Sequence, residues 1–234
     1  MNFFNIIIFS GAGLSQESGV KTFRDNDGLW ENHRVEEVAT PEAFKANPDL
    51  VYHFYNLRRE QLTQVFPNDA HKSISEFQKK FKGKVHLITQ NVDDLLERAG
   101  CSNVLHMHGE LAKMRCQKSG RVFNAPTFFK ADTLCECCKE SASLRPHIVW
   151  FGEVPFHMDD IYRALDECDL FISVGTSNQV YPAASFVQYV KQKGITCWEV
   201  NFEPTQLSEI FDENYYGKAG VELPKILRKL AQDN

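Results

Sequence analysis

Two histidines stand in the stretch His106-Met107-His108-Gly109, and imidazole is the side chain best suited to move a proton near neutral pH. The stretch has no clear helical pattern and ends in a glycine, which suits a solvent-accessible base. A lone histidine is more often structural, and here two compete for the role. The stretch therefore predicts a general base without saying which histidine it is.

Closely spaced glycines follow the first apolar run of the chain. Residues 3–9 lead into Ser10-Gly11-Ala12-Gly13-Leu14-Ser15, a pattern typical of a buried strand that turns into a helix. Such a turn lets backbone N–H groups approach a phosphate, and the helix N-terminus favours negative charge. Gln16 stands where the dinucleotide-binding fingerprint has its third glycine. The loop is therefore either a nucleotide site or an ordinary tight turn.

Polar residues follow three further apolar runs. They are Thr89 to Asp93, Gly175 to Asn178, and Asn201. Ligands of open α/β sheets bind at the carboxyl ends of the strands, so these residues are candidate ligand contacts. The first group could instead cap the next helix, with Asn91 or Asp93 at the N-cap.

The elements that must position these residues alternate along the chain. Strands are expected at Ile6–Phe9, Val85–Thr89, Leu170–Val174 and Thr196–Val200, and helices at Ala70–Phe81, Val92–Ala99, Asp159–Glu167 and Ala183–Lys193. This alternation predicts an α/β fold with a doubly wound, Rossmann-like parallel sheet. Two stretches, at about 25–66 and 112–145, fit the rhythm poorly: the first is apparently helical and the second bears the clustered cysteines. We expect them to form a smaller lobe within one catalytic domain spanning 1–234.

Composition excludes several classes of protein. The net charge is −5 over 234 residues, so nothing in the charge balance suggests a nucleic-acid partner. No segment approaches the roughly 18–20 apolar residues of a membrane span, and no signal peptide is recognisable. Four of the seven cysteines cluster, which favours metal binding over disulfides and predicts a cytoplasmic location.

Taken together, six ordered motifs resemble the sirtuin family over about residues 8–220. They are Gly11-Ala12-Gly13-Leu14-Ser15 with Thr22-Phe23-Arg24, then Thr89-Gln90-Asn91-Val92-Asp93, His108-Gly109-Glu110-Leu111, Val149-Trp150-Phe151-Gly152-Glu153, Gly175-Thr176-Ser177 and Val200-Asn201. The resemblance implies an NAD-dependent protein lysine deacylase that releases nicotinamide and O-acyl-ADP-ribose. Alternatives are a protein mono-ADP-ribosyltransferase and a non-catalytic NAD-sensing module.

The resemblance also implies roles for individual residues. His108 would be the general base and His106 a structural residue. NAD, the co-substrate, would contact Gly11, Ala12, Gly13, Ser15, Thr22, Phe23, Arg24, Trp30, Gln90, Asn91, Asp93, Gly175, Thr176, Ser177, Asn201 and Ala219. The acylated-lysine protein would pair its backbone with Val149, Phe151, Gly152, Val180 and Tyr181, a form of strand addition. The oligomeric state is not indicated, and a monomer is compatible with the sequence.

Two residues are expected to select the acyl group. Tyr55 and Arg58 stand three apart on an expected helix and so share a face. A phenol beside a guanidinium can grip a carboxylate, although most such pairs are a core tyrosine and a surface arginine. Tyr-x-x-Arg at this point resembles the sirtuin branch that removes succinyl and malonyl groups from lysine, which includes bacterial members that also deacetylate. The small Ala39 is compatible with a roomier pocket in that branch.

Sirtuins usually carry a structural zinc held by two Cys-x-x-Cys pairs. Cys135 and Cys138 supply the second pair and Cys116 begins the first, but Ser119 stands three residues on. Structural zinc requires four ligands, and Cys137, a histidine or water could complete the set. The cysteines could also be simply reduced thiols in a flexible insert. The resemblance thus predicts an incomplete zinc site.

Overall fold

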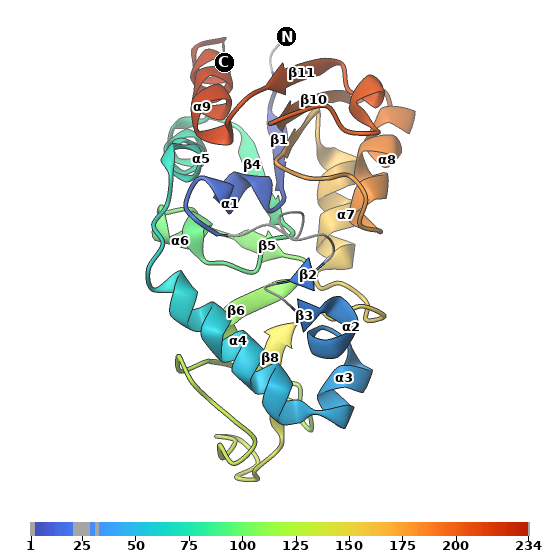
Figure 1. Ribbon diagram of the computed structural model, residues 1–234. Coiled ribbons are helices and arrows are strands. Elements are labelled where there is room, and N and C mark those ends of the chain that lie inside the picture. Colours follow the sequence, from blue (N-terminus) through green and yellow to red (C-terminus); the bar gives the residue numbers. More distant parts are fainter. Residues whose placement is uncertain (1–2, 21–28, 31–32, 234) are drawn as a thin grey trace.

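The computed structural model describes residues 3–20, 29–30 and 33–233, and a six-stranded sheet forms its centre (Figure 1). The strand order is β11-β10-β9-β1-β4-β5, and every neighbouring pair is parallel. The strands are β1 (Asn5–Ser10), β4 (Lys84–Thr89), β5 (Val104–His106), β9 (Leu170–Val174), β10 (Thr196–Asn201) and β11 (Glu213–Tyr216). The expected doubly wound sheet is confirmed, with its topological switch point between β1 and β9.

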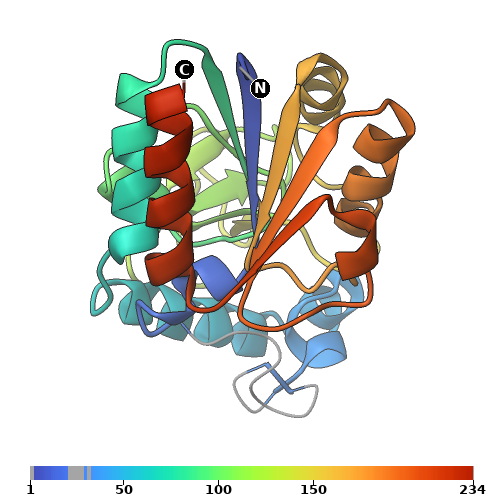
Figure 2. The same ribbon diagram turned by 90° about the horizontal axis from the view of Figure 1, so that it is seen from above.

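Helices cover both faces of this sheet, as Figure 2 shows. One face carries α5 (Asp69–Lys80) and α9 (Ala219–Asp233), and the other carries α7 (Met158–Glu167) and α8 (Phe186–Gln192). Along β1, Ile6 and Ile8 pack into the first core, and Ile7 and Phe9 pack into the second. Successive strand residues point to opposite faces, so a strand covered on both sides must be apolar throughout.

A smaller lobe lies beyond the carboxyl ends of the central strands (Figure 1). Its helices are α2 (Val35–Val38), α3 (Pro41–Ala46) and α4 (Pro48–Leu62), and its antiparallel sheet has the order β7-β6-β8. The strands of that sheet are β6 (Gly109–Cys116), β7 (Val122–Asn124) and β8 (Leu144–Ile148); a hairpin of β2 (Leu29–Trp30) and β3 (His33–Arg34) lies nearby. Helix α4 begins where Asn47 Oδ1 accepts from the Leu50 amide at 3.2 Å.

Two expected helices differ from the structure. The helix expected at Val92–Ala99 is reduced to α6 (Leu95–Arg98), because side chains take the backbone amides that would begin it. Thr89 Oγ1 accepts from the Asn91 amide at 3.0 Å, and Asp93 Oδ1 accepts from the Leu95 amide at 3.2 Å. The N-cap is Asp94, not Asn91 or Asp93. The helix expected at Ala183–Lys193 begins with a 3₁₀ turn (Ala183–Ser185) before α8.

Among the described residues, none of the helices combines the length and apolar character needed to cross a bilayer.

Candidate active site

Three glycines meet at the switch point, where β1 and β9 end. The Gly11 amide donates to the Val174 carbonyl at 2.9 Å, and the Gly13 amide donates to the Gly175 carbonyl at 2.8 Å. A Cβ on Gly13 would lie 2.7 Å from Gly175 Cα, which is closer than real Cβ contacts allow. Glycine is therefore required for backbone packing at this point. The short helix α1 (Gly13–Gln16) follows directly.

Polar side chains from the neighbouring strand ends connect to this loop. Gln90, after β4, donates its amide to Thr176 Oγ1 at 3.0 Å, and Asn201, at the end of β10, donates to the Thr176 carbonyl at 2.8 Å. Asn91 Nδ2 donates to Ser15 Oγ at 3.1 Å. The structure thus brings together, at the carboxyl edge of the sheet, most of the residues expected to contact NAD. Ser177 follows Thr176, and Ala219 opens α9 behind α1.

A buried histidine contacts Ser15 in the loop at this edge of the sheet. His71, on the first turn of α5, is fully buried, with Nε2 3.3 Å from Ser15 Oγ and Nδ1 accepting from the Asn68 amide at 3.3 Å. Ser15 in turn hydrogen-bonds Asp93, whose carboxyl pKa burial raises above its ordinary value. Sequence reasoning missed His71, although Pro67-Asn68 marks the start of its helix.

This histidine makes stability depend on pH. Burial lowers the pKa of His71 from 6.5 to about 4, so below pH 6.5 the unfolded chain binds a proton that the folded chain does not. Stability is then lost as the pH falls from 6.5 toward 4. We expect the His71 contribution to fall by about 2 kcal/mol between pH 7 and pH 5. Urea unfolding of wild type and His71→Gln at both pH values measures it. An identical pH dependence in the two proteins would contradict the assignment.

The two histidines of the His106-Met107-His108 stretch have different environments. His106 is buried, with Nδ1 3.0 Å from the Asn91 carbonyl and Nε2 2.8 Å from Glu97 Oε1, so both nitrogens are engaged. His108 is half-buried, and its Nδ1 lies 3.1 Å from the Gln90 carbonyl. A carbonyl only accepts, so Nδ1 of His108 carries the proton and Nε2 of the neutral ring is the basic nitrogen.

Electrostatics also favour His108 as a base. Burial lowers its pKa below 6.5, partly opposed by the hydrogen bond to the Gln90 carbonyl, so the ring is neutral at physiological pH. The next residue, Gly109, has φ +86°, and a Cβ there would lie 2.0 Å from the His147 carbonyl oxygen. Only glycine fits at that position, which explains the glycine beside the base.

Tyr55 and Arg58 lie on one face of α4, both inside the protein. Tyr55 is 0% exposed and Arg58 is 7% exposed. Trp150 Nε1 donates to the Tyr55 hydroxyl at 3.0 Å, and the Arg58 guanidinium lies over the Phe54 ring at 5.0 Å. Burial lowers the pKa of Arg58 to about 10, which leaves it charged at neutral pH. The alternative of a surface arginine is therefore wrong for Arg58.

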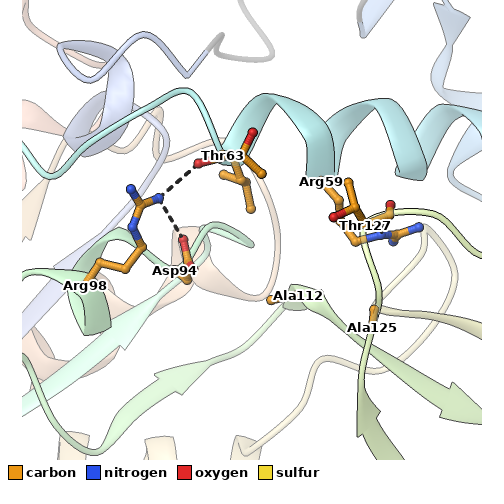
Figure 3. A pocket seen from close by; sticks show the side chains of 8 residues that line it. Arg59, Thr63, Asp94, Arg98, Ala112, Ala125 and Thr127 are labelled. Atoms are coloured by element: carbon orange, nitrogen blue, oxygen red, sulfur yellow. Dashed lines mark hydrogen bonds and ion pairs between the residues drawn. The ribbon is translucent and has the colours of Figure 1, made fainter.

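The next arginine of α4 has a different environment. Arg59 donates Nε to the Thr127 carbonyl at 3.1 Å and lies over the Phe129 ring at 4.5 Å. It lines a cavity of about 300 Å³ between α4 and α6. In Figure 3, Arg59 and Thr127 lie on one side of this cavity, and Asp94 and Arg98 lie on the other. Arg58 and Arg59 are thus adjacent on α4 but contact different parts of the protein.

The segments expected to hold the substrate backbone are loops with exposed apolar side chains. Phe151 is 53% exposed and Tyr181 is 73% exposed; Val180, beside it, is also exposed. The Val149 amide donates to the His108 carbonyl at 2.9 Å, which ties this loop to the candidate base. Gly152 has φ +90°, and its Cβ position is open. The loop that bears the exposed Phe151 is therefore tied to the candidate base.

Four residues expected to contact NAD are not placed. Thr22, Phe23 and Arg24 lie outside the described residues, and so does the side chain of Trp30.

The clustered cysteines come together at the far end of the small lobe. The Sγ atoms of Cys116, Cys135, Cys137 and Cys138 all lie within 4.8 Å of one another. The sulfurs of Cys116 and Cys138 are 3.9 Å apart, and those of Cys135 and Cys137 are 3.3 Å apart. A tetrahedral zinc with Zn–S bonds of about 2.3 Å sets its sulfurs about 3.8 Å apart. The arrangement of the four thiols is therefore compatible with zinc, and Cys137 is the candidate for the ligand that the spacing left open.

Ser119, in place of the second cysteine of the first pair, lies beside this cluster with Oγ 3.2 Å from Cys137 Sγ. We expect Cys137→Ser to lower the zinc content of the purified protein and Ser119→Ala to preserve it. In Cys137→Ser, adding Ser119→Cys should restore zinc by completing two Cys-x-x-Cys pairs. Zinc analysis and the thiolate absorption of cobalt-substituted protein measure both effects. Full zinc content in Cys137→Ser would exclude Cys137 as a ligand.

The remaining three cysteines, Cys101, Cys168 and Cys197, are buried as expected of apolar side chains. Sequence reasoning also missed the hydrogen bond from Trp150, in the motif Val149-Trp150-Phe151, to the Tyr55 hydroxyl. A buried indole needs an acceptor, but its partner on α4 is distant in sequence.

Known proteins match this arrangement. A family model described as "Sir2 family" matches residues 11–182. An "NAD-dependent protein deacylase" of Vibrio parahaemolyticus serotype O3:K6 (strain RIMD 2210633) is 51% identical over 97% of this chain and 95% of that protein.

Solved structures are also similar. A Sir2 homologue in complex with NAD is 40% identical, with a TM-score of 0.87 over 97% of this chain and 90% of that one. Sir2Af2, bound to a myristoylated histone peptide, is 32% identical, with a TM-score of 0.74 over 97% of this chain and 91% of that one.

Proposed function

The chain belongs to the Sir2 family and is an NAD-dependent protein deacylase, and we propose that it prefers lysine acyl groups that end in a carboxylate. Succinyl and malonyl groups are of this kind, and acetyl groups would be processed as well. The observation that carries the proposal is the burial of Tyr55 and a charged Arg58 on one face of α4. A phenol beside a charged guanidinium can bind an entering carboxylate through charge-assisted hydrogen bonds.

His108 is the proposed general base. Its Nδ1 is held by the Gln90 carbonyl, so the basic Nε2 is available to accept a proton from the reacting ribose hydroxyl. NAD supplies the ribose carbon that receives the acyl group, and nicotinamide leaves. The Gln90 carbonyl orients the His108 ring. Gln90 follows β4, and we propose the ribose and nicotinamide pocket at this strand end.

The remaining NAD contacts are proposed at the strand ends. The Gly11–Ser15 loop lies next to Gly175 and Thr176, and Asn201 contacts Thr176 from the next strand. We place the nicotinamide end near Asn91 and Asp93 and the adenosine end near Gly175, Thr176, Ser177, Asn201 and Ala219. The partial positive charge of a helix N-terminus and glycine packing both favour a pyrophosphate close to the loop.

Acylated proteins are the proposed partners, with their backbone against the exposed loops of Val149 to Gly152 and Val180-Tyr181. The Sir2Af2 complex with an acylated histone peptide supports a peptide substrate. We keep three further expectations as proposals: one catalytic domain over 1–234, a monomer without a nucleic-acid partner, and a cytoplasmic location.

A single assay tests the proposed function. Peptides carrying succinyl-, malonyl- or acetyl-lysine are incubated with NAD, and nicotinamide, O-acyl-ADP-ribose and free-lysine peptide are measured by mass spectrometry. We expect all three products in equal amounts, with higher kcat/KM for the two dicarboxylic acyl groups. ADP-ribosylated peptide without deacylation would instead indicate a mono-ADP-ribosyltransferase. An acetyl preference would contradict the carboxylate proposal.

A further inference from the structure

Glu199 is a buried carboxylate on β10 that the proposed mechanism does not use, and its side chain is 0% exposed. A carboxylate is costly to bury unless hydrogen bonds replace its water. Asn178 Nδ2 and Thr205 Oγ1 donate to Oε1, both at 3.0 Å, and Ser208 Oγ donates to Oε2. The donors come from the segments that follow β9 and β10. Glu199 therefore connects two segments at the carboxyl edge of the sheet.

Asn178 has a left-handed backbone conformation in the loop that follows β9. Its φ is +55°, which asparagine tolerates better than most residues. Its buried side chain also donates to Thr205 Oγ1 at 3.1 Å, and its backbone amide donates to Thr176 Oγ1 at 3.2 Å. Glu199 thus holds the side chain of the residue at which the loop changes direction.

Proposed contacts with both substrates lie on either side of Asn178 in the chain. Thr176-Ser177, before it, is proposed to contact NAD, and Val180-Tyr181, after it, is proposed to contact the acylated peptide. Thr176 Oγ1 also accepts from the Gln90 side chain at 3.0 Å, which connects the loop to the strand end proposed for the ribose. We call residues 176–181 the shared loop, because contacts with both substrates depend on its backbone.

We propose that Glu199 is a positioning residue for both substrates, because it holds Asn178 and, through Asn178, the shared loop. This inference rests on the contacts proposed above for NAD and the acylated peptide. A carboxylate only accepts hydrogen bonds, so it fixes the amide nitrogen of Asn178 toward itself. A loop that is already ordered loses less conformational freedom when either substrate binds.

The principal test is Asn178→Gly. Glycine adopts a positive φ without strain, so the variant loses the carboxamide while the backbone conformation stays allowed. We expect KM for NAD and KM for the acylated peptide each to rise about three- to tenfold, because the loop must then be ordered on binding. We expect little change in kcat, because His108 and its contact with Gln90 remain in place. Steady-state kinetics with each substrate varied in turn measure the three constants.

A mutant cycle tests whether Glu199 acts through Asn178. Glu199→Gln keeps an oxygen that can accept from the Asn178 amide, so we expect both KM values to stay near those of wild type. Glu199→Leu removes both acceptor oxygens and should raise both KM values as Asn178→Gly does. In the Asn178→Gly background it should raise them no further, because the hydrogen bond that it breaks is already absent. Additive increases would overturn the inference. If thermal unfolding shows that Glu199→Leu does not fold, Asn178→Gly decides the question.

Ser208→Ala is the matched structural control. Ser208 donates to the other oxygen of Glu199 and begins the 3₁₀ turn Ser208–Ile210, outside the shared loop. We expect this variant to lower the melting temperature and to leave both KM values unchanged. If Ser208→Ala raised the KM values as much as Asn178→Gly, the effect would be a general loss of stability and the inference would be wrong.

Failure of the inference and failure of the proposed function give different results. Tyr181→Ala removes a proposed peptide contact directly, and we expect it to raise KM for the peptide alone. If it does so while Asn178→Gly leaves both KM values unchanged, the proposed peptide contact stands and Glu199 does not position the loop. If Tyr181→Ala leaves KM for the peptide unchanged, the proposed peptide contact is wrong and the inference fails with it. A rise in both KM values in Asn178→Gly, with a rise in one alone in Tyr181→Ala, supports both.

Discussion

Replacement of His108 by alanine is expected to abolish deacylation while NAD still binds. A positioned general base typically contributes about 10²–10⁴-fold to the rate, and no other described imidazole has a basic nitrogen next to Gln90. Removing the ring takes away the proton acceptor but leaves the glycine loop and the Gln90, Asn91 and Asn201 side chains intact. Nicotinamide release measures turnover, and isothermal titration with NAD measures binding. Retained turnover would remove His108 from the mechanism.

A matched control separates catalysis from the loss of any imidazole. His53 lies on the exposed side of α4, away from the strand ends. We expect His53→Ala to keep wild-type kcat and NAD affinity. Equal losses in the two variants would point to a general effect on folding and contradict the specific role of His108.

The pH profile gives a second measure of the same base. Burial lowers the pKa of His108 below 6.5, and only the neutral ring accepts a proton. Turnover should therefore be constant near neutral pH and fall only when the pH drops below 6.5. An acid limb above pH 6.5 would mean that a different group titrates.

The sequence predicted the site best where chemistry depends on local spacing. The strand bounds at Leu170–Val174 match β9, and the polar residues after β4, β9 and β10 meet at one edge as parallel strands require. Glycine spacing also indicated the loop, and the structure supplies a reason that the local pattern does not contain: a Cβ at Gly13 has no room against Gly175. The strand ends and the loop were predicted from patterns that a single segment shows by itself.

Features that depend on contacts between distant segments could not be predicted. The fourth thiol of the cysteine cluster, Cys137, was left open because Cys-x-Cys-Cys does not say which two sulfurs turn inward. The shortened helix α6 follows from side chains of Thr89 and Asp93 that capture backbone amides, and helical periodicity does not register this competition. His71 belongs to α5, far in sequence from the Ser15 that it contacts.

The pair on α4 shows the same limit. Spacing placed Tyr55 and Arg58 on one face, as observed, but it could not show that Trp150 hydrogen-bonds Tyr55 or that Arg145 lies over the Trp150 ring. The burial of both side chains excludes a surface arginine, and burial depends on the whole small lobe. The acyl selectivity that we propose therefore depends on tertiary packing, which the motif only suggests.

Arg58→Met is expected to reverse the acyl preference. Methionine keeps much of the length and apolar surface of the arginine stem but removes the charge, so a bound succinyl carboxylate would be buried without its partner. Losing a hydrogen bond to a charged group costs roughly 1.5–3 kcal/mol, so kcat/KM for succinyl-lysine should fall about 10- to 150-fold. Acetyl-lysine activity should be kept, because its acyl group carries no charge.

Two companion variants make this test specific. Arg58→Lys keeps the charge but not the two-pronged geometry, and we expect it to fall between wild type and Arg58→Met on succinyl-lysine. Arg59→Met removes a neighbouring buried arginine that contacts Thr127 and Phe129, so it should lower the melting temperature without changing the ratio of the two activities. Steady-state kinetics on both peptides measure the ratios. Unchanged succinyl activity in Arg58→Met would show that the buried charge has a structural role alone, since a reader of carboxylates cannot lose its guanidinium and keep its preference.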